Sequence, residues 1–134
     1  MRIPPERISM SAVAYVEQAR GWAKTLEDRA RHDGAPSLTD ARIAVSRRTG
    51  VSPGTLENLR KNRLKAIAAH VYDSLRGGVI RALEAELRHL EHELTILRQT
   101  GVDPRSNATA AVTSDIQKVR SALGLSEASS DGGV

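Results

Sequence analysis

The stretch TGVSPGTLENLRKNR, residues 49–63, decides the fold of this chain because it joins a tight turn to the start of a short helix. Gly50 can adopt the left-handed backbone conformation that closes a preceding helix. Ser52 can cap a new helix whose first residue is Pro53, where the missing N–H costs nothing. The stretch therefore predicts that one helix ends before Gly50 and that a second covers residues 53–63.

The residues before this stretch supply the first of the two helices. Ser37 is expected to be its N-cap, with the acidic Asp40 three residues later in the first turn. A short helix is then expected over residues 41–48. Two short helices joined by a three-residue turn that contains Gly form a helix-turn-helix pattern. The sequence predicts this motif at residues 39–63.

The second helix is expected to have a buried side and an exposed side. Leu56 and Leu59 would face inward together with Arg63, and the two leucines would form a small core with Val45 and Val51. At 100° per residue, the opposite side of the helix holds Gly54, Asn58, Lys61 and Lys65, with Glu57 at its margin. The residues predicted to read base edges in the DNA major groove are Gly54, Glu57, Asn58 and Lys61.

Each of these four residues suits contact with base edges. Gly54 has no side chain, so the helix can approach the groove closely. Asn58 can pair with an adenine edge, and Lys61 can reach guanine or phosphate. Glu57 can accept a hydrogen bond from a cytosine amine, or can repel a wrong site.

The charge distribution also points to a polyanionic partner. Residues 37–65 contain seven basic and two acidic residues, a local excess of +5 in a chain whose net charge is +4. A local basic patch favours nucleic acid as the partner. Backbone phosphates are expected to be gripped, without sequence choice, by basic side chains and by the N-terminus of the second helix. The residues assigned to this role are Arg42, Arg47, Arg48, Ser52, Thr55, Arg60, Arg63 and Lys65.

The segment ARIAVSRRTGVSPGTLENLR, residues 41–60, resembles the helix-turn-helix of bacterial and phage repressors, including the lactose-repressor class. The resemblance is carried by a small residue four positions before the turn glycine, a Val-Ser pair after it and two apolar anchors three residues apart. These features are Ser46, Gly50, Val51-Ser52, Leu56 and Leu59. The resemblance implies groove-facing roles for Ser52, Pro53, Gly54, Glu57, Asn58 and Lys61.

Further helices are expected on both sides of the motif. A helix over residues 10–31 has apolar residues at steps of three and four, flanked by Tyr15 and Trp22, which are expected to pack against neighbouring helices. These apolar residues are Val13, Val16, Ala19, Ala23, Leu26 and Ala30. Another helix is expected from Lys65 to Arg76, ended by a hinge at Gly77-Gly78. The DNA-binding domain would therefore cover residues 10–76, after a flexible N-terminus at residues 1–9.

The C-terminal part predicts a helical hairpin over residues 79–123. Its first helix has a heptad seam that is expected to serve dimerisation. The seam consists of Ile80, Leu83, Leu87, Leu90, Leu94 and Leu97. The seam can pair with the seam of a second chain, or it can pack against a helix over residues 107–123 of its own chain. We expect a combination in which two hairpins form a dimeric four-helix bundle. The tail at residues 124–134 is expected to be disordered.

The composition excludes several classes of protein. There is no Cys, so disulfides and Cys-based zinc sites are ruled out. No apolar run is long enough to span a bilayer. No phosphate-binding Gly-rich loop, nucleophile elbow or acid–base pair suggests an enzyme. We therefore expect no catalysis, no cofactor, no metal, no small-molecule ligand and no membrane partner. The expected location is the cytoplasm, at a bacterial nucleoid or in a phage-infected cell.

Together these patterns predict an all-α protein with a helix-turn-helix domain followed by a coiled-coil hairpin. The predicted function is sequence-specific binding of double-stranded DNA by a homodimer, as in a small bacterial or phage transcriptional regulator. One alternative is a DNA-packaging protein like the small subunit of phage terminases, which would assemble into rings. The other is a helical protein-interaction adaptor that does not bind DNA.

Overall fold

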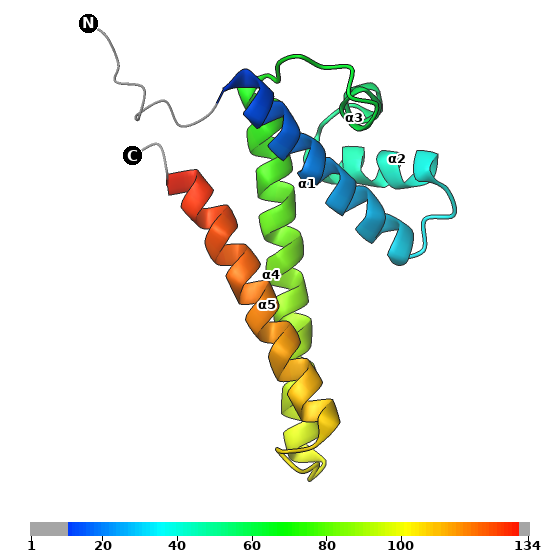
Figure 1. The fold of residues 1–134 in the computed structure, drawn as a ribbon. Helices are drawn as coiled ribbons and strands as arrows, with labels where there is room; N and C mark the ends of the chain where they lie inside the picture. The colour runs from blue at the N-terminus through cyan, green and yellow to red at the C-terminus, as the bar shows by residue number, and fades with distance from the viewer. Residues whose placement is uncertain (1–10, 132–134) are drawn as a thin grey trace, which may run out of the picture. The chain divides into compact units, whose positions relative to one another are not determined.

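The computed structural model describes residues 11–131, and over this range every regular element is an α-helix (Figure 1). The all-α prediction is therefore confirmed. The helices are α1 (Ala12–His32), α2 (Leu38–Thr49), α3 (Pro53–Arg60), α4 (Ala69–Gln99) and α5 (Asn107–Asp131). The N-terminus predicted to be flexible, residues 1–9, lies outside the described range. The tail predicted to be disordered, residues 124–134, is helical as far as Asp131, and its last three residues lie outside the described range.

The chain divides into two compact units. The N-terminal unit is Met1–Val79 and the C-terminal unit is Ile80–Val134. The residues of α4 belong to both, and the helix is continuous across the division. Each unit has its own buried core.

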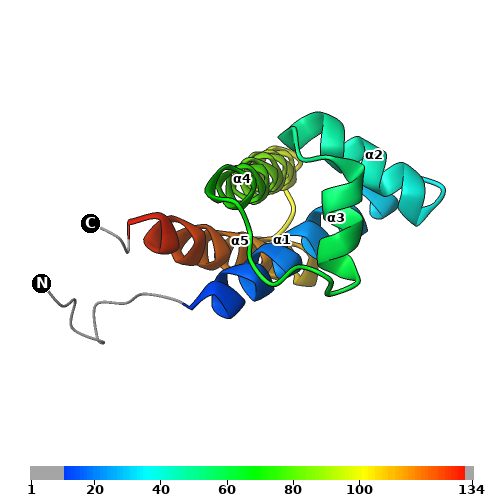
Figure 2. The same cartoon turned by 90° about the horizontal axis from the view of Figure 1, so that it is seen from above.

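The core of the N-terminal unit is built on α1, which packs against both α2 and α3 while these two helices also contact each other (Figure 2). The predicted apolar stripe of α1 is buried from Val16 to Ala30. Several members of this stripe are alanines, so neighbouring helices can approach closely. Val13 was expected in the stripe but lies in the first turn of α1 and is 67% exposed.

Aromatic residues fix α1 to the first turns of α4. The ring of Tyr72 in α4 lies 5.0 Å from that of Tyr15 and 4.9 Å from that of Trp22, both in α1. The hydroxyl of Tyr72 donates a hydrogen bond to Gln18 Oε1 at 2.6 Å. The prediction that Tyr15 and Trp22 pack against a neighbouring helix is confirmed. These contacts close the N-terminal unit by adding the start of α4 to the three-helix core.

The start of α2 and the turn after it follow the predicted chemistry. Ser37 caps α2, since its Oγ accepts from the Asp40 N–H at 3.1 Å and its hydroxyl donates to the Asp40 carboxylate at 2.7 Å. Gly50 closes α2 with φ of 80°, in the left-handed region. Ser52 then caps α3, and Pro53 is its first residue. The sequence therefore specified this corner through local hydrogen bonds and backbone freedom.

The end of α3 differs from the prediction. The helix stops at Arg60 rather than at Arg63, because Asn62 adopts a left-handed conformation with φ of 59°. The N–H of Arg63 donates to the Asn58 carbonyl, and the N–H of Asn62 donates to the Leu59 carbonyl. These two hydrogen bonds form a Schellman motif, in which Asn62 occupies the position where Gly is more frequent. Arg63 is consequently exposed, and its predicted inward orientation is wrong.

The predicted hinge at Gly77-Gly78 is also wrong. The expected helix from Lys65 begins instead at Ala69, and it runs without a break to Gln99. A Cβ atom placed on Gly78 would lie 2.9 Å from Cγ2 of Thr49 and 3.2 Å from Cδ1 of Leu26. Gly78 is therefore a packing residue that lets α4 approach α2 and α1 closely.

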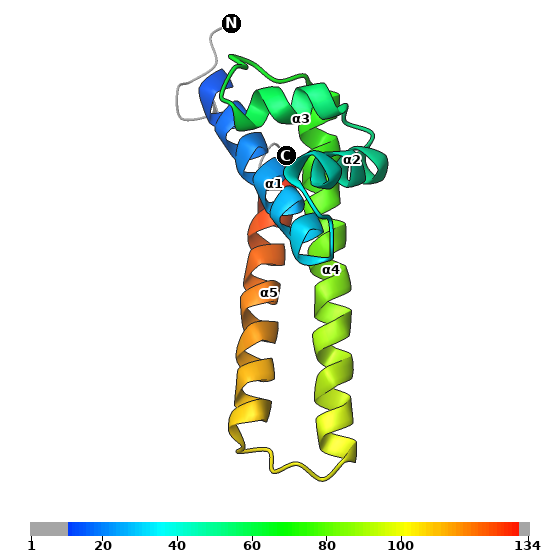
Figure 3. The same ribbon diagram turned by 90° about the vertical axis from the view of Figure 1, so that its right-hand side faces the viewer.

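The C-terminal unit is an antiparallel helical hairpin within one chain. Figure 3 shows α5 running back alongside the later turns of α4 after the loop at residues 100–106. Leu90 of α4 is buried with Ile116, Val119 and Leu123 of α5. Four other seam residues and one residue of α5 pack against this cluster and remain partly exposed: Ile80, Leu83, Leu87, Leu94 and Val112. Of the two pairings left open by the sequence, the structure contains the one within the chain.

The last predicted seam residue contributes less to the hairpin. Leu97 is half-exposed, and its neighbour Ile96 is 43% exposed. Both lie in the last turn of α4, where the chain turns into the loop before α5. The hairpin therefore covers the middle of the seam more completely than its end.

Candidate nucleic-acid interface

Helix α3 has two distinct sides. Leu56 and Leu59 are completely buried, together with Val45 and Val51, so the predicted small core is present. The opposite side carries four residues that we call the reading surface: Gly54, Glu57, Asn58 and Lys61. Gly54 and Lys61 are exposed, and Glu57 and Asn58 are half-exposed. Residues 11–131 therefore leave this side of α3 at least partly open, which is the condition for any contact with a partner.

The first turn of α3 uses its hydroxyl groups to hold the helix start. Ser52 Oγ accepts a hydrogen bond from the Thr55 N–H at 3.2 Å, and the two hydroxyl oxygens lie 2.9 Å apart. Both side chains were predicted to bind phosphate. In this structure they bind each other, although Ser52 remains exposed. A Cβ placed on Gly54 would meet no atom within 4 Å, so the backbone there is open to a close approach.

The reading surface contains an ion pair between Glu57 and Lys61, which lie one helical turn apart. Their side chains are 41% and 46% exposed. The hydrogen bond and charge of Lys61 lower the pKa of Glu57, and the more distant guanidinium groups of Arg42 and Arg63 act in the same direction. Glu57 therefore carries its negative charge inside a surface that is otherwise basic.

Two arginines assigned to phosphate binding have an internal role instead. Arg60 Nη1 lies 2.9 Å from Oε2 of Glu27, and Arg42 Nε lies 3.5 Å from Oε1 of the same carboxylate. We call these three residues the Glu27 cluster. Glu27 is completely buried, and the side chains of Arg42 and Arg60 are only 13% and 30% exposed. The cluster joins α1, α2 and α3, so it fixes the position of α3 within the unit.

Sequence reasoning missed Glu27, although a signal existed. Glu27 follows Ala23 by four residues and precedes Ala30 by three, which places an acidic residue on the buried stripe of α1. A buried carboxylate needs a cationic partner. The sequence could have shown that basic residues were required to pair with Glu27, but not that Arg42 and Arg60 are these residues.

Burial raises the pKa of Glu27 above its ordinary value, since the ionised carboxylate has lost its water. The hydrogen bond and charge of Arg60, and then the charge of Arg42, oppose this shift in part. Arg60 also lies 3.8 Å from Asp28, a second acidic residue of α1. Arg60 is therefore held by two carboxylates, which strengthens its assignment to the interior.

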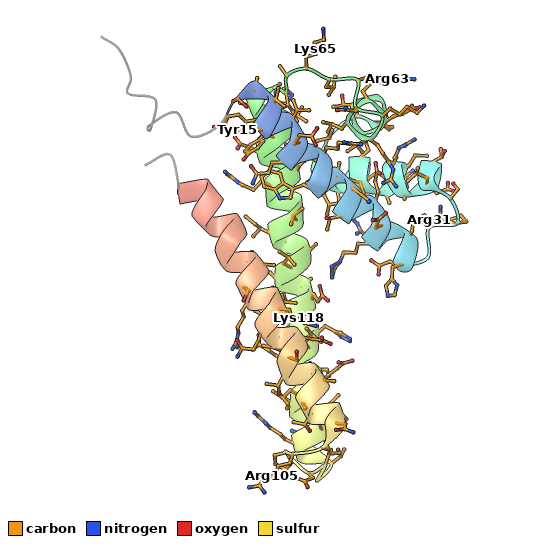
Figure 4. All side chains as sticks on the ribbon, viewed as in Figure 1. Tyr15, Arg31, Arg63, Lys65, Arg105 and Lys118 are labelled. Atoms are coloured by element: carbon orange, nitrogen blue, oxygen red, sulfur yellow. The ribbon has the colours of Figure 1, made fainter. Side chains whose placement is uncertain are left out.

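The remaining predicted phosphate-binding residues stay on the surface. Arg47 and Arg48 are exposed in the last turn of α2. Arg63 and Lys65 are exposed in the segment after α3, and Figure 4 shows their side chains projecting from the ribbon. With Lys61, these residues supply five cationic side chains at or near the two ends of α3.

A cleft of about 410 Å³ adds two basic residues that the sequence reasoning did not assign. It is lined by residues of α1 and by the last residue of α3: Glu17, Arg20, Gly21, Lys24 and Arg60. Arg20 Nη1 lies 3.7 Å from Glu17, and its Nη2 lies 3.5 Å from the Arg60 carbonyl oxygen. Arg20 is thus partly engaged by the protein itself, and Lys24 is exposed.

Other kinds of site find little support in the part of the chain that the structure describes. Within residues 11–131, no three His, Asp or Glu side chains gather in a way that could hold a metal ion. The described helices also include none that is both long and apolar enough to cross a bilayer. Comparisons of this chain with protein-family models, with curated proteins and with solved structures find no match. The reading surface and its basic surroundings remain the best candidate site.

Proposed function

We propose that this protein binds double-stranded DNA and that α3 enters the major groove. The observation that carries the proposal is the corner between α2 and α3. Gly50 adopts a left-handed conformation there, and Leu56 and Leu59 are completely buried behind it. This geometry leaves the reading surface on the uncovered side of a short helix, as helix-turn-helix proteins require.

The exposed cations fit the contacts expected around such a helix. Arg47 and Arg48 precede the turn, while Arg63 and Lys65 follow α3. Basic side chains on both sides of a reading helix can bind the phosphates that border one groove. Asn58 is half-exposed at the middle of α3 and has the donor and acceptor that adenine requires. We assign affinity to the cations and sequence choice to the reading surface.

The Glu27 cluster supports the proposal in an indirect way. Helix α3 has only eight residues, so it cannot be stable by itself. A base-reading helix also needs a fixed orientation, because hydrogen bonds to base edges tolerate little displacement. The Glu27 cluster fixes this orientation because Arg60, the last residue of α3, binds Glu27 of α1. Arg42 and Arg60 are therefore assigned to positioning and not to phosphate binding.

We further propose that the protein acts as a homodimer and regulates transcription. Five apolar residues of the hairpin core are only partly buried by their own chain, so a second hairpin can cover them. Such a dimer would present two α3 helices to a palindromic site with half-sites roughly 34 Å apart, or a multiple of that distance.

The experiment that tests DNA binding is a titration of the full chain against a duplex selected from random sequences, at several salt concentrations. A protein that binds phosphates should lose affinity linearly in a plot of log K against log salt. Asn58→Ala should weaken binding to the selected duplex by roughly 1–3 kcal/mol, with little change for a scrambled duplex. Asn107→Ala, the same change at the start of α5, is the matched control and should bind like the parent.

Two results would contradict the proposal. If the parent binds no duplex at low salt, the chain is not a DNA-binding protein and the adaptor alternative gains support. If the parent binds but Asn58→Ala keeps the preference for the selected duplex, α3 does not read bases through Asn58.

A further inference from the structure

The ion pair on the reading surface has a chemical pattern that is complementary to a C·G base pair. Glu57 and Lys61 place a carboxylate acceptor directly beside an ammonium donor. In the major groove, a C·G pair presents the cytosine N4 amine beside the guanine O6 and N7 acceptors. The two patterns are complementary, since the carboxylate meets the cytosine amine and the ammonium group meets the two guanine acceptors. An A·T pair also presents an amine beside an acceptor, but its two acceptors are not adjacent and its thymine adds a methyl group, so C·G is the better match.

We infer that Glu57 and Lys61 act as one unit that reads a C·G base pair, with Glu57 on the cytosine amine and Lys61 on guanine. The inference rests on the proposed function and names part of the sequence that the site must contain. It also gives Glu57 a reason to lie among cations. A carboxylate near a phosphate backbone weakens binding to every sequence except one that offers it a donor, so Glu57 acts as a filter.

Three observations on this surface carry the inference beyond the ion pair itself. Both side chains lie opposite the buried leucines of α3, on the side that the protein leaves uncovered. Gly54 lies one turn before Asn58 and leaves the backbone open, so α3 can come close enough for a Glu side chain to reach a base. The charges of Lys61, Arg42 and Arg63 keep the Glu57 carboxylate ionised, which makes it an acceptor only.

Two variants test the inference on the full chain. Glu57→Gln removes the negative charge and should raise affinity for unrelated duplexes, while the preference for C·G at one position falls roughly tenfold. The double variant Glu57→Lys with Lys61→Glu keeps an ion pair on the same surface. It should prefer the inverted G·C pair at that position. The matched control is Glu93→Gln in the hairpin, where Glu93 Oε1 lies 3.2 Å from His89 Nε2. This change should alter neither the affinity for unrelated duplexes nor the preference for C·G.

The measurement uses the duplex selected by the parent and its single base-pair replacements, with affinities determined by fluorescence anisotropy. If the parent selects A·T pairs only, or if Glu57→Gln keeps the C·G preference, the inference is overturned while DNA binding stands. If the parent selects no duplex at all, the proposed function fails first, and the two failures are therefore distinguishable.

Discussion

At the residue scale, the basic side chains of the N-terminal unit differ in their contacts because of what surrounds them, and not because of their position in the sequence. Arg60 and Lys61 are neighbours in the chain, yet Arg60 binds the buried Glu27 and Lys61 lies on the exposed side of α3. A buried carboxylate strongly selects the nearest guanidinium groups, because an unpaired charge in the interior is costly. The interior thus removes two cations from the surface that we propose binds DNA.

Replacing Glu27 by Ala should lower the free energy of unfolding by roughly 3 kcal/mol, since it leaves the part-buried Arg42 without a counter-charge and Arg60 with only the exposed Asp28. The measurement is urea unfolding followed by the fluorescence of Trp22, the single Trp of the chain. Glu17→Ala is the matched control on the same helix. Its carboxylate is 53% exposed, so that change should cost at most about 1 kcal/mol. Equal losses in the two variants would show that the Glu27 cluster does not stabilise the fold.

The raised pKa of Glu27 predicts a dependence of stability on pH. The folded state holds the proton of Glu27 more tightly than the unfolded state, whose pKa is near 4.5. The contribution of Glu27 to stability is therefore fully present below pH 4.5 and is lost as the pH rises through the raised pKa of the folded state. The parent should lose stability relative to Glu27→Gln between pH 4 and neutral pH. Urea midpoints of both proteins across this range check the prediction, and a constant difference would refute it.

At the scale of elements, close approach between helices decides more than helix propensity does. Gly77 and Gly78 are poor helix formers, but α4 passes through both without a break. Gly78 faces Thr49 and Leu26, where any Cβ would lie within 3.2 Å of a side-chain atom. Thr49 cannot rotate away without cost, because its hydroxyl donates to the Val45 carbonyl at 2.8 Å. Gly78 is therefore needed at this position because a larger residue would push α4 away from Thr49 and Leu26.

Gly78→Ala should destabilise the protein by about 1–2 kcal/mol, because the overpacked contact outweighs the gain in helix propensity. Gly21→Ala is the matched control. Gly21 is also helical, and a Cβ there would meet nothing within 4 Å, so this change should stabilise by about 0.5–1 kcal/mol. Thermal unfolding of the two variants gives the comparison. A gain in both would mean that α4 can move away from α2 at no cost.

At the scale of the whole molecule, the surface proposed to bind DNA and the seam proposed to pair with a second chain lie in different units. The reading surface lies in the unit Met1–Val79, and the leucine seam lies in the unit Ile80–Val134. Each unit has a core of its own, so changes in one can be tested without assuming damage to the other. Under the proposed function, the oligomeric state would therefore depend on the hairpin.

The mass of the protein in solution should be twice the 14.5 kDa of one chain. The reason is that a two-helix hairpin leaves part of its apolar seam uncovered, and a second hairpin can bury it. Sedimentation equilibrium over a range of concentrations is the measurement. A monomer at all concentrations would contradict the dimer, and an assembly of eight or more chains would favour a DNA-packaging role.

Much of the fold could be read from short stretches of sequence. The caps at Ser37 and Ser52 and the glycine at position 50 were all predicted correctly, and so was the burial of Leu56 and Leu59. Each of these features depends on residues within about four positions of one another. Backbone freedom, capping hydrogen bonds and helical periodicity are local, so the sequence determines them by itself.

The features that required the tertiary structure all depend on residues far apart in the chain. Arg60 is 33 residues from Glu27, and Gly78 is 29 residues from Thr49. Asn62 as the end of α3 was missed for a different reason, since Asn adopts the left-handed conformation only when the surrounding contacts favour it. The sequence determined the corner that exposes the reading surface. Only the packed structure decided which cations remain outside, because burial and charge pairing are properties of neighbours in space.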